Sequence, residues 1–146
     1  MADNYLEFSE ILDNLTVEET AWLEQQLDED PETGCPVFLA DYEDRDPDDE
    51  YCGFAYSFEE CGGKRQLWVR AEESGNADHA AHLVQKFLKK FRPHECWSLT
   101  YPTTCSKPRV GEFGGGAVFV TADTIQWENA YGFIEDQRAA FEAKRG

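Results

Sequence analysis

The stretch that decides the fold is NADHAAHLVQKFLKKF, residues 76–91. Its apolar side chains recur at the i, i+4, i+7, i+8 and i+11 spacing of a helix that buries one face. These side chains are Ala80, Val84, Phe87, Leu88 and Phe91. Asn76 or Asp78 is suited to cap the start, and Pro93 stops the helix. The sequence therefore predicts an amphipathic helix over residues 76–91.

Segments rich in aromatic and β-branched residues lie on both sides of this helix and are typical of strands. They cover residues 36–42, 51–58 and 65–71 before it, and residues 96–101, 117–121 and 124–127 after it. Further helices are expected over residues 4–30 and 129–144. Runs of strands separated by helices predict a single α+β domain over residues 1–146, in the order α-βββ-α-ββ(β)-α. We expect a largely antiparallel sheet of five to six strands with the helices packed on it.

The two terminal helices are expected to bury apolar faces. In the first, a short helical turn carries Tyr5, Phe8, Ile11 and Leu12. The main helix then begins at a capping box formed by Thr16 and Glu19, and Pro31 and Gly34 follow its end. In the last helix the expected inner face consists of Tyr131, Ile134, Ala140 and Phe141.

The net charge of −17 is concentrated in the first part of the chain. Residues 1–60 hold 20 acidic residues and one basic residue, a balance of −19, whereas residues 61–146 hold 10 acidic and 12 basic residues, a balance of +2. Because acidity selected for solubility would spread over the whole surface, this partition favours one negative face that docks on a cationic surface. The alternative is that a helix and a hairpin each carry a solvated acidic side. The charge disfavours direct binding to nucleic acid or an anionic membrane.

The densest acidic run is residues 41–50, DYEDRDPDDE, with Tyr51 directly after it. A second group of acids lies near the end of the first expected helix, where the helix dipole does not favour them. Tyrosines are enriched at interfaces, so Tyr42 and Tyr51 either flank the charge as anchors or pack in the sheet. The predicted partner-binding residues are Asp28, Glu29, Asp30, Asp41, Tyr42, Glu43, Asp44, Asp46, Asp48, Asp49, Glu50 and Tyr51.

The same run does not form a calcium loop. Asp44, Asp46 and Asp48 have the spacing of its first ligands, but Asp49 stands where the loop needs glycine. Ala55 stands where the bidentate glutamate belongs. We therefore predict no dedicated metal site there.

A glycine-rich segment, Cys105 to Gly116, offers an alternative site for a small ligand. It contains Lys107 and Arg109, but it leads into a strand and lacks the Gly-Lys-Ser/Thr ending of a phosphate-binding loop. We expect its glycines to permit a bulge or a close backbone approach.

No catalytic, cofactor-binding or metal-ligating residues are predicted. His79 and His82 lie three positions apart on the helix, but no third metal ligand has a readable spacing, and we expect both at the helix surface. The five cysteines lie in a chain that does not need disulfides, which predicts reduced thiols in a cytoplasm. The basic cluster of Lys86, Lys89, Lys90 and Arg92 either contacts an acidic partner or, as we expect, pairs with the acidic part of the chain.

The sequence thus favours a non-enzymatic interaction module that binds the basic surface of a nucleic-acid-handling protein. Small acidic proteins that inhibit restriction or CRISPR complexes by mimicking nucleic acid are similar in size and charge. A ligand-binding protein or enzyme using the 105–116 loop, and a structural subunit of a larger assembly, are the alternatives. We expect no signal peptide and no membrane span, and therefore a cytoplasmic protein.

Overall fold

The computed structural model describes residues 4–42, 53–72, 75–110 and 113–145. Within these residues the chain is an α+β fold in which all paired strands are antiparallel. The elements in chain order are β1 (Asn4–Leu6), β2 (Phe8–Leu15), α1 (Val17–Leu27), the 3-10 helix η1 (Val37–Leu39), β3 (Ala55–Cys61), β4 (Lys64–Ala71), α2 (Ala77–Phe91), β5 (Cys96–Cys105), β6 (Gly114–Thr121), β7 (Ile125–Asn129) and α3 (Ala130–Arg145).

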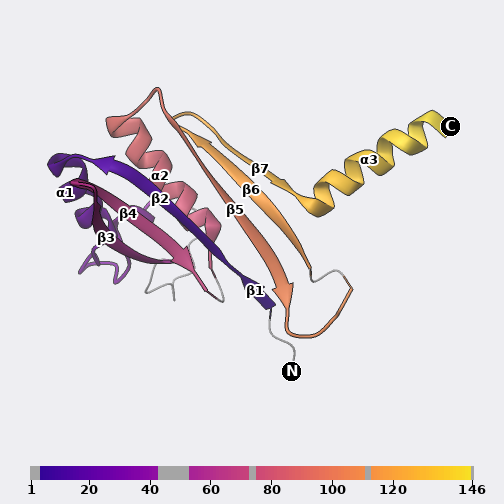
Figure 1. Cartoon of the computed structure of the whole chain (residues 1–146), viewed down its shortest axis with the longest axis horizontal. Helices are drawn as coiled ribbons and strands as arrows, with labels where there is room; N and C mark the ends of the chain where they lie inside the picture. The colour runs from indigo at the N-terminus through magenta and orange to yellow at the C-terminus, as the bar shows by residue number, and fades with distance from the viewer. Residues whose placement is uncertain (1–3, 43–52, 73–74, 111–112, 146) are drawn as a thin grey trace.

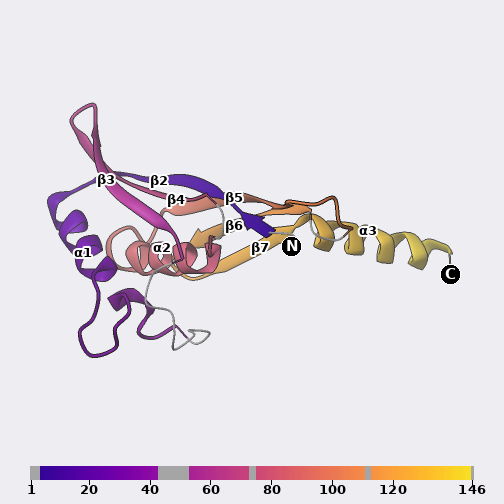
Figure 2. The same cartoon turned by 90° about the horizontal axis from the view of Figure 1, so that it is seen from below.

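The described strands form two sheets, with the orders β1-β5-β6-β7 and β2-β4-β3. Because β1 and β2 are almost continuous, residues 4–15 pass from one sheet to the other (Figure 1). The indole N–H of Trp97 on β5 donates a hydrogen bond of 2.9 Å to the carbonyl of Ile11 on β2. The two sheets are therefore joined edge to edge and behave as one strand layer (Figure 2).

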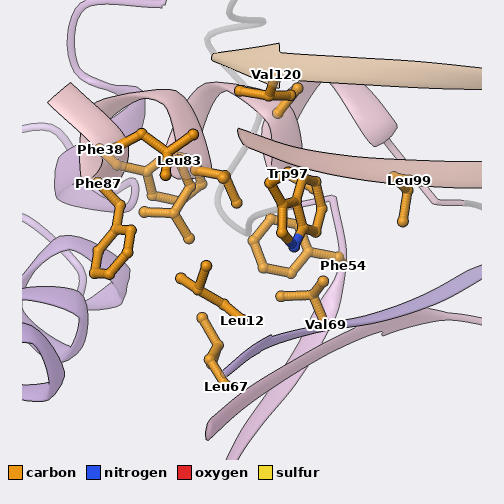
Figure 3. Close-up of a cluster of buried hydrophobic side chains, with 14 of the residues drawn as sticks. Leu12, Phe38, Phe54, Leu67, Val69, Leu83, Phe87, Trp97, Leu99 and Val120 are labelled. Atoms are coloured by element: carbon orange, nitrogen blue, oxygen red, sulfur yellow. The ribbon is translucent and has the colours of Figure 1, made fainter. Parts of the chain in front are cut away.

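Helices α1 and α2 lie on the same side of this strand layer (Figure 2). One hydrophobic cluster lies between the layers and draws on both sheets, both helices and η1. Figure 3 shows Leu67 and Val69 from β4 pointing toward Leu83 and Phe87 of α2. The alternation of β4 explains this, since Leu67 and Val69 are buried while Trp68 and Arg70 face the other way.

Helix α2 is the expected one, and the capping box of α1 is confirmed. The backbone N–H of Glu19 donates to Thr16 Oγ1 at 3.1 Å, and the N–H of Thr16 donates to Glu19 Oε1 at 2.8 Å. Asn76 caps α2 by accepting a hydrogen bond from the N–H of His79.

The end of α2 is tied to the start of α1 by a buried ion pair. Arg92 Nε donates to Glu19 Oε2 at 3.0 Å, and its Nη2 donates to Glu19 Oε1 at 3.2 Å. Nη2 also donates to the carbonyls of Asp13 and Asn14. Arg92 therefore connects α2, α1 and the end of β2 in a single network.

The prediction of a helical turn before Thr16 is wrong, because residues 4–6 and 8–15 are strands. The apolar residues Phe8, Leu12 and Leu15 are spaced like one face of a helix. In the structure the register of β2 shifts between Leu12 and Leu15, and Asn14 has a φ of 54°. This irregularity returns Leu15 to the buried face, so a bulged strand imitates the helical spacing.

The predicted strand over residues 36–42 is also wrong. Val37–Leu39 form a single 3-10 turn, in which Phe38 and Leu39 are fully buried. A short apolar run indicates that its residues are buried, but it does not show whether they form a strand or a helical turn. Among the described residues there are thus fewer strands than predicted between α1 and α2 and two more before α1.

The C-terminal helix is where it was predicted, but it contacts β6 and β7 at its start instead of lying across the sheet. None of its residues is buried, so the expected inner face of Tyr131, Ile134, Ala140 and Phe141 is exposed. Figure 1 shows α3 projecting away from the strand layer, at the opposite end from α1. None of the described helices combines the length and apolar character needed to span a membrane.

Candidate protein-interaction surface

Residues 28–41, here called the acidic connection, lead from the end of α1 through η1 and carry five carboxylates. Backbone hydrogen bonds fix the course of this segment: Asp30 N–H donates to Cys35 O at 2.8 Å and Val37 N–H donates to Asp28 O at 3.0 Å. The carboxylates belong to Asp28, Glu29, Asp30, Glu32 and Asp41. An ordered backbone holds these charges in place, which lowers the entropy lost when a partner binds.

Most of these carboxylates face solvent. Asp28, Glu29, Glu32 and Asp41 are exposed, and Asp30 is half-buried, with Oδ1 accepting from the N–H of Glu32. Helix α1 ends at Leu27, so Asp28 to Asp30 lie beyond the helix instead of in its last turn. Figure 2 shows the acidic connection on the helix side of the molecule, far from α3.

Asp41 is the member of this set that pairs with α2. Its Oδ1 accepts from Lys86 Nζ at 2.8 Å and lies 3.3 Å from His82 Nε2. Partial burial alone raises the pKa of Asp41, but the hydrogen bonds and charges of Lys86 and His82 outweigh it and lower the pKa. Asp28, Glu29 and Glu32 form no ion pair with any described residue and keep their charge available to a partner.

Both described flanks of residues 43–52 contact the first part of α2. On one side, the ring of Tyr42 packs edge-on against His79, with centroids 5.3 Å apart, and is tilted against the ring of His82, with centroids 5.1 Å apart. On the other, the N–H of Gly53 donates to His79 Nδ1 at 2.9 Å, and its carbonyl accepts from Asn76 N at 2.7 Å. Gly53 must be small there, because a Cβ would lie 2.2 Å from Asn76 Cβ.

The remaining predicted contact residues lie outside the described residues. These are Glu43, Asp44, Asp46, Asp48, Asp49, Glu50 and Tyr51. Of the two tyrosines expected as anchors, Tyr42 packs on the histidines of α2 and against the core cluster.

The histidines of α2 support the structure around this surface. His79 is buried, which differs from the surface position that we expected, and its side chain holds Gly53. His82 is half-buried beside Asp41. No group of three or more His, Cys, Asp or Glu side chains among the described residues is arranged to hold a metal ion.

The basic cluster pairs in part with the acidic part of the chain, as expected. Lys86 pairs with Asp41, and Arg92 pairs with Glu19 and lies 3.6 Å from Glu95. Lys89 and Lys90 are exposed at the end of α2.

The glycine-rich segment continues into strand β6, which includes Gly114, Gly115 and Gly116. The expected close approach is present at Gly116, where a Cβ would lie 2.6 Å from the Tyr101 hydroxyl and 2.8 Å from the Glu128 carbonyl. Lys107 and Arg109 are exposed on the connection between β5 and β6. This segment leads into a strand and not into a helix.

The side of the strand layer that faces away from α1 and α2 was not predicted as a surface of interest. There the guanidinium of Arg70 stacks on Trp68, 3.9 Å from the ring centroid, and donates to Ser57 Oγ at 3.1 Å. Trp68 Nε1 in turn donates to Ser9 Oγ at 2.8 Å. The alternation of Gln66, Trp68 and Arg70 with buried residues already marks this second face in the sequence. The side chains of Trp68 and Arg70 are thus held in place on this face by neighbouring serines.

Cysteine chemistry adds no further site to the described surface. Cys35 and Cys105 are buried thiols, and Cys61 and Cys96 are exposed thiols without a disulfide.

Comparison with protein-family models, curated proteins and solved structures finds no match to this chain.

Proposed function

We propose that this protein is a non-enzymatic interaction module whose acidic connection docks on a basic surface of another protein. The observation that carries the proposal is the set of exposed carboxylates Asp28, Glu29 and Glu32, held on a hydrogen-bonded backbone and unpaired with any described cation. Charges fixed in this way attract a cationic surface over a distance and increase the rate of association.

The contacts made by the residues on either side of 43–52 also support the proposal. Asp41 and Tyr42 on one side of residues 43–52, and Gly53 on the other, contact the histidines and Lys86 of α2. A partner that meets the carboxylates of the acidic connection and those of the acidic run 43–50 would need a basic patch of the kind that binds phosphates. We therefore infer that the partner is a nucleic-acid-binding protein and that this chain competes with its nucleic acid.

The proposal is tested by removing charge without changing shape. Asp28→Asn, Glu29→Gln and Glu32→Gln together neutralise the acidic connection. Asp123→Asn, Glu7→Gln and Glu72→Gln form the matched control, since they remove the same charge from exposed positions elsewhere. Both triple variants, and the wild type, are used to capture proteins from a host lysate at low salt and again at high salt.

We expect the wild type and the control to retain the same basic protein, and the acidic-connection variant to lose it by about tenfold or more in affinity. Salt should weaken the complex, because it screens charges that remain near the surface. Added DNA or RNA should displace the chain from the captured protein. Equal capture by both variants would refute docking through residues 28–32, and a complex indifferent to nucleic acid would refute the competition.

A further inference from the structure

Helix α3 presents an apolar stripe that nothing described in the chain covers. Phe133, Ile134 and Phe141 are 58%, 48% and 60% exposed, and they lie on one side of the helix. The helix touches the rest of the molecule at its start, against β6 and β7 (Figure 1). A helix of 16 residues is marginally stable in water without packing. We therefore expect another surface to cover this stripe.

The start of α3 is held firmly enough to direct the helix outward. Asn129 Oδ1 accepts from the N–H of Gly132 at 2.7 Å, as a capping side chain does. The hydroxyl of Tyr131 donates to the carbonyl of Phe113 at 2.5 Å. The projection of α3 seen in both views therefore has local causes at its base (Figures 1 and 2).

An apolar groove of about 520 Å³ lies at this base, where α3 leaves the sheet. Its lining includes small residues of β6, Gly115, Gly116 and Ala117, together with Phe133 and Ile134 of α3. Glu128 also belongs to the lining, and this residue is exposed. The groove thus suits an aromatic ring that carries a cation beside it.

The C-terminal end of α3 carries such an aromatic ring with a cation beside it. Phe141 is exposed, and the guanidinium of Arg145 lies 5.7 Å from its ring centroid. Within one chain this end of α3 points away from the strands (Figure 1). Antiparallel pairing of the α3 helices of two copies would bring each Phe141 to the base of the other helix and each Arg145 towards the Glu128 of the other copy.

The charge distribution favours a second copy over a charged partner. Helix α3 carries three acids, Glu135, Asp136 and Glu142, which its three bases, Arg138, Lys144 and Arg145, balance. In a chain with a net charge of −17, this neutral helix lies at the end opposite the acidic connection (Figure 2). Pairing through α3 therefore brings two copies together while it keeps their acidic surfaces apart.

We propose that α3 is a dimerisation helix, and that two copies pair antiparallel with Phe141 of each seated in the groove at the base of the other. Such an interface is symmetric, because the same groove and the same side chains are used twice. It is independent of the acidic docking proposed above.

The first test is the association state, measured by sedimentation equilibrium of the full chain over a wide concentration range. We expect a dimer, and we expect Phe141→Glu to raise the dissociation constant by about thirtyfold or more, as loss of a central interface side chain does. Val17→Glu is the matched control, since Val17 is 90% exposed on α1 and its substitution should leave the dimer intact. A wild-type chain that stays monomeric at high concentration, or a dimer unaffected by Phe141→Glu, would overturn the proposal.

The second test addresses the antiparallel arrangement. Arg145→Glu and Glu128→Arg should each weaken the dimer, and the double variant should restore it, because the swap exchanges the charges across both symmetric contacts. A double variant weaker than either single variant would exclude this pairing. The variant with a neutralised acidic connection should still dimerise, which separates this proposal from the docking function.

Discussion

Helices α2 and α3 have nearly the same length, 15 and 16 residues, and both show an apolar stripe in sequence. Eight residues of α2 are buried, including Phe87 and Leu88, whereas none of α3 is. The difference lies in what faces each helix: α2 lies across the strand layer, and α3 leaves it at the edge (Figure 1). An amphipathic pattern therefore shows that a helix has a face to bury, but it does not show which surface will cover it.

The two helices also differ in whether their charged side chains form ion pairs. The charged residues Lys86 and Arg92, in and just after α2, pair with carboxylates from the acidic part of the chain. The charges of α3 form no ion pair with the described residues. Helix α2 is thus tied into the fold by packing and charge together, which makes the end of the molecule around α1 and α2 the stable one.

The largest expected effect comes from the same substitution made in both helices. Phe87→Ala should lower the free energy of unfolding by about 3–5 kcal/mol, because the ring is fully buried and its loss leaves a cavity. Phe141→Ala should change it by less than about 0.5 kcal/mol in a monomeric sample, because that ring is exposed. Urea unfolding followed by tryptophan fluorescence measures both. Similar losses for the two variants would show that α3 packs on the body in solution.

A somewhat smaller effect is expected from the ion pair that joins α2 to α1. Arg92→Ala leaves Glu19 buried without its cation and should cost about 3 kcal/mol of unfolding free energy. Lys89→Ala is the control on the same helix, at an exposed position, and should cost less than about 0.5 kcal/mol. The comparison is read from the same urea curves. An Arg92 variant as stable as the control would mean that water replaces the pair without penalty.

The smallest effect is a change in the pH dependence of stability. Burial alone raises the pKa of Glu19, but hydrogen bonds from Arg92 and Thr16 and the Arg92 charge hold the pKa below its usual 4.5. Because the pKa is lower in the folded state, the contribution of Glu19 is complete above pH 4.5 and is lost as the pH falls through the folded-state value.

In Glu19→Gln this proton uptake is absent. The urea midpoint of the wild type should therefore fall more steeply than that of the variant as the pH falls below 4.5. Asp136→Asn in exposed α3 serves as the control and should follow the wild-type slope. Parallel slopes for wild type and Glu19→Gln would contradict the lowered pKa.

The sequence predicted the α+β class, helix α2 and the capping box of α1, because these depend on local patterns. It misplaced residues 4–15, since the bulge near Asn14 gives a strand the apolar spacing of a helix. It misplaced Val37–Leu39 because burial of Phe38 and Leu39 is a tertiary effect that a three-residue turn satisfies as well as a strand. For the surface, the charge partition located the carboxylates of residues 28–41. The contacts of His79 with Gly53 and of His82 with Asp41 could not be predicted from the sequence, because the partners lie in distant parts of the chain.

The strand that passes between the two sheets also sets the order in which the fold can be completed. Residues Phe8–Leu12 pair with β4, and Asn4–Leu6 pair with Thr103–Cys105 of β5, most of the length of the chain away. Contacts so distant in sequence are slow to form, because a long loop must close first. During synthesis the N-terminal strand has no β5 partner until the ribosome has passed Cys105. Residues 4–6 are therefore secured in the sheet only after residues 103–105 have been made, although they precede them in the chain.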